Sequence, residues 1–204
     1  LAVLGGSKIS SKTPIIENII DKVDDIIIGG GMSFTFIKAL GGKIGSSIHE
    51  DSMTEKALSI LEFAEQKNTK IHLPVDVVCA KEFKEGAESK IFAIDSISDE
   101  YEGLDSGPKS LEKFKKIIMS SKTILWNGPV GVFELESFSK GTKEIGTAIS
   151  ESTKSGAFSL VGGGDSVAAV KKFKLENEVS YVSTGGGAMP VSYTHLTLPT
   201  MLPV

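Results

Sequence analysis

The stretch "SLVGGGDSVAAV" (159–170) joins a short apolar run to an alanine-containing segment through three consecutive glycines. Glycines at such a junction let the backbone turn sharply and come close to a neighbour. Asp165 and Ser166 then stand where a helix would begin. The free N–H groups and the positive dipole end of that helix would suit a phosphate. A single junction fits an ordinary tight turn better, so the rest of the chain has to decide between the two.

The same pattern, an apolar run that ends in glycine before a helical segment, recurs along the chain. The four further junctions are "LAVLGGSK" (1–8), "DDIIIGGG" (24–31), "TILWNGP" (123–129) and "EVSYVSTGGG" (178–187). Hydrophobic spacing predicts helices over 13–23, 32–40, 52–68, 107–121, 137–153 and from Ser166, and strands over 70–80, interrupted at Pro74, and over 90–95.

Alternation of strands and helices predicts an α/β fold. The expected architecture is a doubly wound parallel sheet with helices on both faces, a Rossmann-like three-layer domain. In such sheets ligands bind outside the carboxyl ends of the strands, and all five glycine junctions should lie at that edge. Five junctions on one edge favour a phosphate-bearing ligand over five unrelated turns.

Composition excludes several classes of protein. A formal net charge of −4 argues against nucleic-acid binding by bulk electrostatics. The lone Cys79 excludes a disulfide framework and a Cys-rich metal site, and it suits a reducing cytosol. No apolar run approaches the roughly 20 residues of a membrane span. We therefore expect a cytoplasmic protein with neither a nucleic-acid nor a membrane partner.

All 22 basic residues are lysines, and the chain contains no arginine. Planar, two-pronged recognition of phosphates and carboxylates is mainly the work of arginine. Any anion held by this chain must therefore be held by lysine ammonium groups, backbone N–H groups and metal ions.

Two lysines follow the first glycine pair at a spacing of four. If the segment turns into a helix, Lys8 and Lys12 face one side and form a pair of cations for neighbouring phosphates. The alternative is two solvated surface lysines. Thr13 is predicted as the N-cap of the first helix, with Pro14 at its first helical position.

The other polar candidates each have a structural alternative. Asp165 is either a helix N-cap or a ligand for Mg²⁺, and the hydroxyl and N–H of Ser166 would then meet a phosphate. Asn127 either binds a phosphate or closes an Asx-turn before Gly128. Glu134 either contacts ribose hydroxyls or lies near the start of the next helix. "STGGG" (183–187) is either an anion nest or a loose loop.

The usual nucleotide fingerprints are absent. None of the glycine junctions reads GxGxxG, and the chain has no GxxxxGK[ST]. A dinucleotide-dependent oxidoreductase would share the architecture, but it requires the first fingerprint and an acidic residue about 20 positions further on. The second alternative is non-enzymatic: a remnant that binds nucleotide without catalysis, a folded remnant that binds nothing, or a scaffold.

Taken together, the junctions resemble the carboxyl-terminal, nucleotide-binding half of phosphoglycerate kinase. The matching pieces, in family order, are "LGGSKISSK", "IIIGGGMSFTFIKA", "LPVDVV", "GLDSGPKS", "ILWNGPVGVFE", "KGT", "LVGGGDSVAAV" and "VSTGGGA". They run from residue 1 to about residue 188. The resemblance implies Mg²⁺-dependent phosphoryl transfer between 1,3-bisphosphoglycerate and ADP, a step of glycolysis, by an enzyme expected to be a monomer.

The resemblance also assigns roles to individual residues. The expected adenine pocket is lined by Gly30, Gly31, Gly103 and Leu104. The expected contacts to ribose and phosphates are Lys12, Asn127, Pro129, Glu134, Gly163, Gly164, Asp165, Ser166, Gly185 and Gly186, with Asp165 on the metal. The residues expected near the phosphoryl group in transfer are Lys8, Gly164 and Gly187.

Three departures from the family pattern limit what the chain is expected to do. The arginine-rich amino-terminal half that binds phosphoglycerate is absent, so we expect nucleotide binding without turnover. The family commonly has aspartate where Ser11 stands, which changes the surroundings of Lys12. The final segment, "MPVSYTHLTLPTMLPV", differs from the segment with which the family continues. We therefore expect a nucleotide-binding domain over 1–188 and an irregular tail, foreign to the fold, over 189–204.

Overall fold

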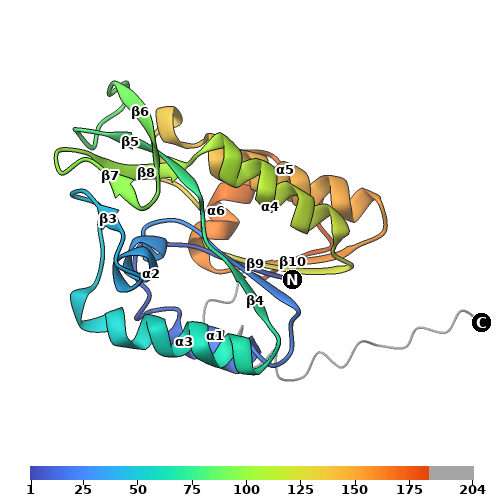
Figure 1. Cartoon of the computed structure of the whole chain (residues 1–204). Helices are drawn as coiled ribbons and strands as arrows, with labels where there is room; N and C mark the ends of the chain where they lie inside the picture. Colours follow the sequence, from blue (N-terminus) through green and yellow to red (C-terminus); the bar gives the residue numbers. More distant parts are fainter. Residues whose placement is uncertain (184–204) are drawn as a thin grey trace, which may run out of the picture.

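The computed structural model describes residues 1–183, which fold around a six-stranded parallel sheet (Figure 1). Its strands are β1 (Ala2–Leu4), β2 (Asp25–Ile28), β4 (Lys70–His72), β9 (Thr123–Asn127), β10 (Phe158–Gly162) and β11 (Tyr181–Ser183). They are arranged in the order β11-β10-β9-β1-β2-β4, and every neighbouring pair is parallel. This is the doubly wound order, in which the chain reverses its direction of travel between β1 and β9.

Helices cover both faces of this sheet, as the alternating pattern predicts (Figure 1). One face packs against α4 (Pro108–Ser120), α5 (Lys140–Lys154) and α6 (Gly164–Lys172). The other face packs against α1 (Thr13–Ile19), α2 (Met32–Ala39) and α3 (Thr54–Gln66). Along β1, Val3 points into the first core while Ala2 and Leu4 point into the second, because successive strand side chains alternate. The predicted three-layer α/β fold is therefore confirmed.

A second, antiparallel sheet was not anticipated. It contains β6 (Ser89–Ala93), β5 (Asp76–Ala80) and β8 (Glu102–Ser106), in that order, and lies at the upper left of Figure 1. A short parallel pair, β3 (Lys43–Ile44) with β7 (Ser96–Ile97), lies beside it. The predicted strand over 70–80 is thus two strands, since Pro74 separates β4 of the main sheet from β5 of the second sheet.

Several helix boundaries differ from prediction. Thr13 is the first helical residue rather than the N-cap, which is Lys12, and Pro14 is second. Thr13 donates its hydroxyl to the carbonyl of Ile9 at 3.0 Å, because a tight turn over 9–13 already precedes the helix. Helix α6 begins at Gly164, two residues before the predicted start. The predicted helix over 137–153 is a 3₁₀ turn, η2 (Glu136–Phe138), followed by α5. A second 3₁₀ turn, η1 (Asp51–Met53), precedes α3.

The two sheets are joined at the start of α4. Asp76, on β5, is buried and accepts hydrogen bonds from the backbone N–H groups of Lys109 at 3.1 Å and Ser110 at 2.8 Å. Its carboxylate therefore caps a helix whose own preceding residue, Gly107, has no side chain to do so. Within residues 1–183, no helix is long and apolar enough to cross a membrane.

Candidate functional site

The glycine junctions at 1–8 and 123–129 are in backbone contact where β1 and β9 end. Gly5 N–H donates to Asn127 O, and Gly6 N–H donates to Pro129 O, each at 3.0 Å. Gly128 has φ +107°, and a Cβ placed there would lie 2.1 Å from Gly5 O. Only glycine fits this close approach. The contact lies at the reversal point of the sheet, the position where doubly wound folds bind ligands.

A cavity of about 530 Å³ opens at this point. Seven of the predicted site residues line it: Gly30, Gly31, Gly103, Leu104, Pro129, Glu134 and Asp165. They come from four separate parts of the chain, so the fold brings together residues that are distant in sequence. The volume falls within the range of small-molecule sites.

Asp165 marks the polar end of the cavity, and Lys12, Asn127 and Gly163 lie behind it without lining the cavity themselves. The Lys12 ammonium donates a hydrogen bond to Asn127 Oδ1, across 115 positions of sequence. Burial lowers the pKa of Lys12, and the nearby charge of Asp165 acts in the opposite direction. Gly163, the N-cap of α6, has φ +92°, and a Cβ there would lie 3.3 Å from Asn127 Nδ2. The start of α6 therefore lies beside a half-buried cation, a combination suited to an anion.

The side chains of Asn127 and Ser166 have partners that the sequence did not predict. Asn127 forms no Asx-turn, because the residue two positions on is Pro129, which has no N–H to donate, and Asn127 Oδ1 accepts from Lys12 instead. The N–H of Gly128 has an acceptor on another element. That acceptor is Ser166 Oγ, at 2.5 Å, and Ser166 is fully buried. The Ser166 hydroxyl thus holds the turn after β9. The predicted contact of Ser166 with phosphate remains a prediction for its N–H.

Asp165 stands at an open helix start. A Cβ on its neighbour Gly164 would meet no atom within 4 Å. Residues 1–183 contain no group of three or more His, Cys, Asp or Glu side chains that could hold a metal ion. A cation at Asp165 would thus have at most one further such side chain from residues 1–183 and take its other ligands from elsewhere. Mg²⁺ bound with a nucleotide has that pattern, since phosphate oxygens and water complete its shell, so the site fits it.

Apart from Leu104, the side chains of the apolar end of the cavity were missed by sequence reasoning. This end consists of Phe34 from α2, Val77 from β5, Leu104 from β8 and Phe83 from the loop between β5 and β6. A Cβ on Gly103 would lie 2.2 Å from the Phe34 ring, so this glycine admits the phenyl group. Phe34 and Val77 look like ordinary core residues in sequence. The one available signal was Phe83, a lone aromatic residue within the charged segment "KEFKEG" (81–86).

The predicted Lys8–Lys12 pair is not arranged as expected. Residues 8–12 form turns rather than a helix, and Lys8 is exposed and does not line the cavity. Its charge acts on Glu50, whose carboxylate also accepts hydrogen bonds from Ser10. The position of Lys8 near a transferred phosphoryl group stays a prediction. Gly185, Gly186 and Gly187, and the tail over 189–204, lie outside the described residues.

The sequence model of the family described as phosphoglycerate kinase matches residues 1–192. The chain belongs to the phosphoglycerate kinase family. It is 52% identical to the phosphoglycerate kinase of Porphyromonas gingivalis over 198 residues, which are 97% of this chain and 47% of that protein. It is 53% identical to the Thermosipho africanus enzyme over 189 residues, 92% of this chain and 47% of the relative.

Solved structures agree with this assignment. Phosphoglycerate kinase from Coxiella burnetii superposes with a TM-score of 0.89 at 44% identity, covering 94% of this chain and 49% of that one. The Pyrococcus horikoshii enzyme gives a TM-score of 0.77 at 29% identity, covering 94% and 48%. The chain spans about half the length of the phosphoglycerate kinases that it matches.

Two of the matching pieces each place a buried aspartate against backbone N–H groups. Asp76 of "LPVDVV" caps α4, which begins in "GLDSGPKS". Asp105 of the second motif is buried and accepts from the N–H groups of Ser106 at 2.9 Å and Gly141 at 2.7 Å. Burial raises the pKa of Asp105 to about 7. Asp105 lines the cavity, and neither the motif nor the spacing distinguished it from the structural Asp76.

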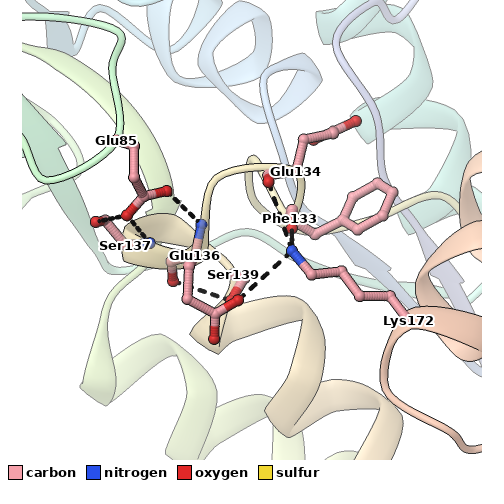
Figure 2. A network of polar contacts seen from close by, with 7 residues as sticks. All are labelled: Glu85, Phe133, Glu134, Glu136, Ser137, Ser139 and Lys172. Carbon is pink, nitrogen blue, oxygen red and sulfur yellow. Dashed lines mark hydrogen bonds and ion pairs between the residues drawn. The ribbon is translucent and has the colours of Figure 1, made fainter.

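The wall that carries Glu134 is held by a polar network (Figure 2). Lys172 of α6 donates to the carbonyl oxygens of Phe133 at 2.6 Å and Glu134 at 3.5 Å. On the other side, Glu85 accepts from the backbone N–H groups of Glu136 at 2.6 Å and Ser137 at 3.1 Å. The segment 133–137 is thereby anchored to two elements that are distant in sequence.

Proposed function

We propose that this chain binds ADP or ATP as its Mg²⁺ complex in the cavity at the reversal point of the sheet. The observation that carries the proposal is the two-ended site. One end is lined by apolar and aromatic side chains, and the other ends at Asp165, on an open helix start with the half-buried Lys12 nearby. A nucleoside diphosphate has the same division between an apolar base and an anionic tail.

The proposed roles follow from the positions of the residues. The base lies against Gly30, Gly31, Gly103 and Leu104, and the carboxylate of Glu134 binds the ribose hydroxyls beside Pro129. Lys12, Asn127 and the N–H groups at 163–166 hold the phosphates, and Asp165 holds Mg²⁺. The bound Mg²⁺ neutralises charge on the phosphates. Gly185 and Gly186 complete the proposed phosphate contacts.

The chemistry proposed for the whole enzyme is reversible phosphoryl transfer between 1,3-bisphosphoglycerate and ADP. Such transfer needs positioning and charge neutralisation more than a covalent nucleophile. Lysine and N–H groups supply both, with Lys8, Gly164 and Gly187 proposed beside the phosphoryl group. The phosphoglycerate would bind through a part of the enzyme outside this sequence. We therefore propose that the chain alone does not turn over.

Calorimetric titration tests the proposal directly. We expect saturable 1:1 binding of MgADP to the 204-residue chain and no binding of NAD. Preference for NAD would instead support a dinucleotide-binding oxidoreductase domain. A folded chain that binds neither would support a scaffold without a nucleotide site, and the residue roles above would be wrong.

A coupled assay tests the second part of the proposal. With 3-phosphoglycerate and MgATP, the chain is expected to give no phosphoryl transfer above background, because the site for the second substrate is missing. Turnover near that of a complete phosphoglycerate kinase would contradict this.

A further inference from the structure

The segment 133–137 carries two residues of the cavity wall, Glu134 and Leu135. Glu134 is exposed, and within residues 1–183 its carboxylate has no hydrogen bond or ion pair to fix its direction. Its direction is therefore set by the backbone from which it projects. What holds that backbone decides where the carboxylate points.

Lys172 holds this backbone in an unusual way. It is the last residue of α6, where a lysine ordinarily interacts with the carbonyls of its own helix. Here its ammonium group instead reaches the carbonyl of Phe133 at 2.6 Å and that of Glu134 at 3.5 Å, 39 and 38 positions away. The carboxylate of Glu136 lies 3.6 Å from the same ammonium group, and the side chain is only 34% exposed.

Glu85 holds the other end of the segment (Figure 2). Its carboxylate accepts from the N–H groups of Glu136 and Ser137 and from the Ser137 hydroxyl, and these bonds lower the pKa of Glu85. Ser137 Oγ in turn accepts from Gly86 N–H at 3.0 Å. With this end secured by Glu85, the carbonyls at 133 and 134 depend on Lys172 alone among the side-chain contacts of residues 1–183.

We propose that Lys172 is a positioning residue for nucleotide binding. Its ammonium group fixes the Phe133 and Glu134 carbonyls and thereby aims the Glu134 carboxylate at the ribose hydroxyls. Because Lys172 and Asp165 stand on the same nine-residue helix, α6 sets the position of the ribose contact and of the phosphate contact together. The inference rests on the proposed nucleotide-binding function, which it extends to a residue that touches no part of the ligand.

The proposal separates ribose recognition from recognition of base and phosphates. Loss of Lys172 leaves the carbonyls at 133 and 134 without a side-chain partner, so the Glu134 carboxylate loses its fixed direction while the Phe133 ring stays in the core. Lys12, Asn127 and the start of α6 have no hydrogen bond to Lys172 and keep their positions. A variant without the Lys172 ammonium group should therefore lose the part of its affinity that comes from the ribose hydroxyls, and keep the rest.

The test compares MgADP with Mg-2′,3′-dideoxyADP by calorimetry on the 204-residue chain. In the wild-type chain, loss of the hydroxyls is expected to weaken binding about tenfold or more, as for hydrogen bonds to a charged group. In K172M that ratio should fall to less than about threefold, with dideoxyADP binding unchanged within about twofold. E134Q should also reduce the ratio. K172R keeps the charged donor and should restore most of it.

Lys171 supplies the matched control. It lies one position earlier in the same helical turn and is exposed, so K171M removes the same charge without touching the segment. K171M should keep the wild-type ratio. The ratio of two affinities is insensitive to a general loss of stability, which melting of each variant records separately.

Three results would overturn the inference in distinguishable ways. If K172M keeps the wild-type ratio, Lys172 does not position the ribose contact, while the proposed function stands. If wild-type protein binds both nucleotides equally, there is no ribose contact to position. If the folded wild-type chain binds neither nucleotide, the proposed function itself fails.

Discussion

The two ends of the cavity are built from different kinds of backbone. The polar end forms where parallel strands β1, β9 and β10 stop and their glycine junctions begin. The apolar end draws on the antiparallel sheet, through β5, β8 and the loop at 81–88, and on α2. Strand ends and helix starts supply N–H groups and close backbone contacts, whereas a second sheet supplies a wall of side chains.

The difference teaches which part of the site tolerates change. At the polar end the strand junctions of Gly5 and Gly128 meet backbone to backbone, so a Cβ added at either glycine has nowhere to go. At the apolar end the contacts are between side chains, which can repack when one of them changes. We therefore expect substitutions at the polar end to cost more stability or affinity than substitutions at the apolar end.

The largest effect is expected from G128A. The new Cβ would lie 2.1 Å from Gly5 O, and φ is +107°, so the junction of β1 and β9 has to separate. We expect a loss of roughly 4 kcal/mol or more in the free energy of unfolding, measured with denaturant. G41A is the matched control: φ is +86° but no atom lies within 4 Å of the new Cβ, and about 1 kcal/mol should be lost. Equal losses in G128A and G41A would mean that backbone strain at positive φ, and not the contact with Gly5, destabilises G128A.

The next effect concerns Asp105 and pH. Burial raises the pKa of its carboxyl from 3.8 to about 7, so the folded chain holds a proton that the unfolded chain has released. The contribution of Asp105 is most favourable below pH 3.8 and is lost as the pH rises to 7, by up to about 1.4 kcal/mol per pH unit. Nearby Glu144 strengthens this shift and Lys140 weakens it.

Comparison with D105N isolates the titration, since asparagine binds no proton in this range. Between pH 5 and 7 the unfolding free energy of the wild-type chain should fall relative to D105N by about 2 kcal/mol. Parallel pH profiles for the two chains would show that Asp105 is ionised throughout in the fold.

K12M tests the polar end without disturbing its backbone. Because burial disfavours the Lys12 charge in the folded chain, its removal should change the unfolding free energy by less than about 1 kcal/mol. MgADP affinity should instead fall roughly 10- to 100-fold, the usual worth of a charged hydrogen bond. K171M, which removes an exposed lysine that does not line the cavity and has no proposed role in the site, is the comparison for nucleotide affinity. An equal loss in both variants would point to long-range charge rather than to the contact.

The smallest effect is expected at the apolar end, from F83A. Phe83 lines the cavity yet is 59% exposed, so its loss should hardly change stability. Affinities for ADP and for adenosine should fall by the same factor, about threefold to tenfold, since only the contact with the base is lost. F158A is the control, because Phe158 is 40% exposed and does not line the cavity. Unequal factors for ADP and adenosine would place Phe83 near the phosphates instead.

The sequence by itself determined the parallel sheet, its two helical layers and the edge at which the glycine junctions gather. Those features are local: an apolar run, a glycine and a helix start lie next to one another in the chain. Seven of the predicted residues accordingly line one cavity. The antiparallel sheet escaped prediction because β8 carries few of the apolar or β-branched residues that mark a strand, and its pairing with β5 spans more than 20 residues.

Only the tertiary structure decided which side chains meet. Lys12 and Asn127 are 115 positions apart, Gly128 and Ser166 are 38, and Lys172 and Phe133 are 39. Spacing along a chain fixes neighbours within one helix or strand, but contacts between elements depend on strand order and helix packing. For that reason the sequence identified the edge of the sheet that is proposed to bind phosphates. The apolar wall, the buried Asp105 and the anchoring of Glu134 by Lys172 became visible only in the folded chain.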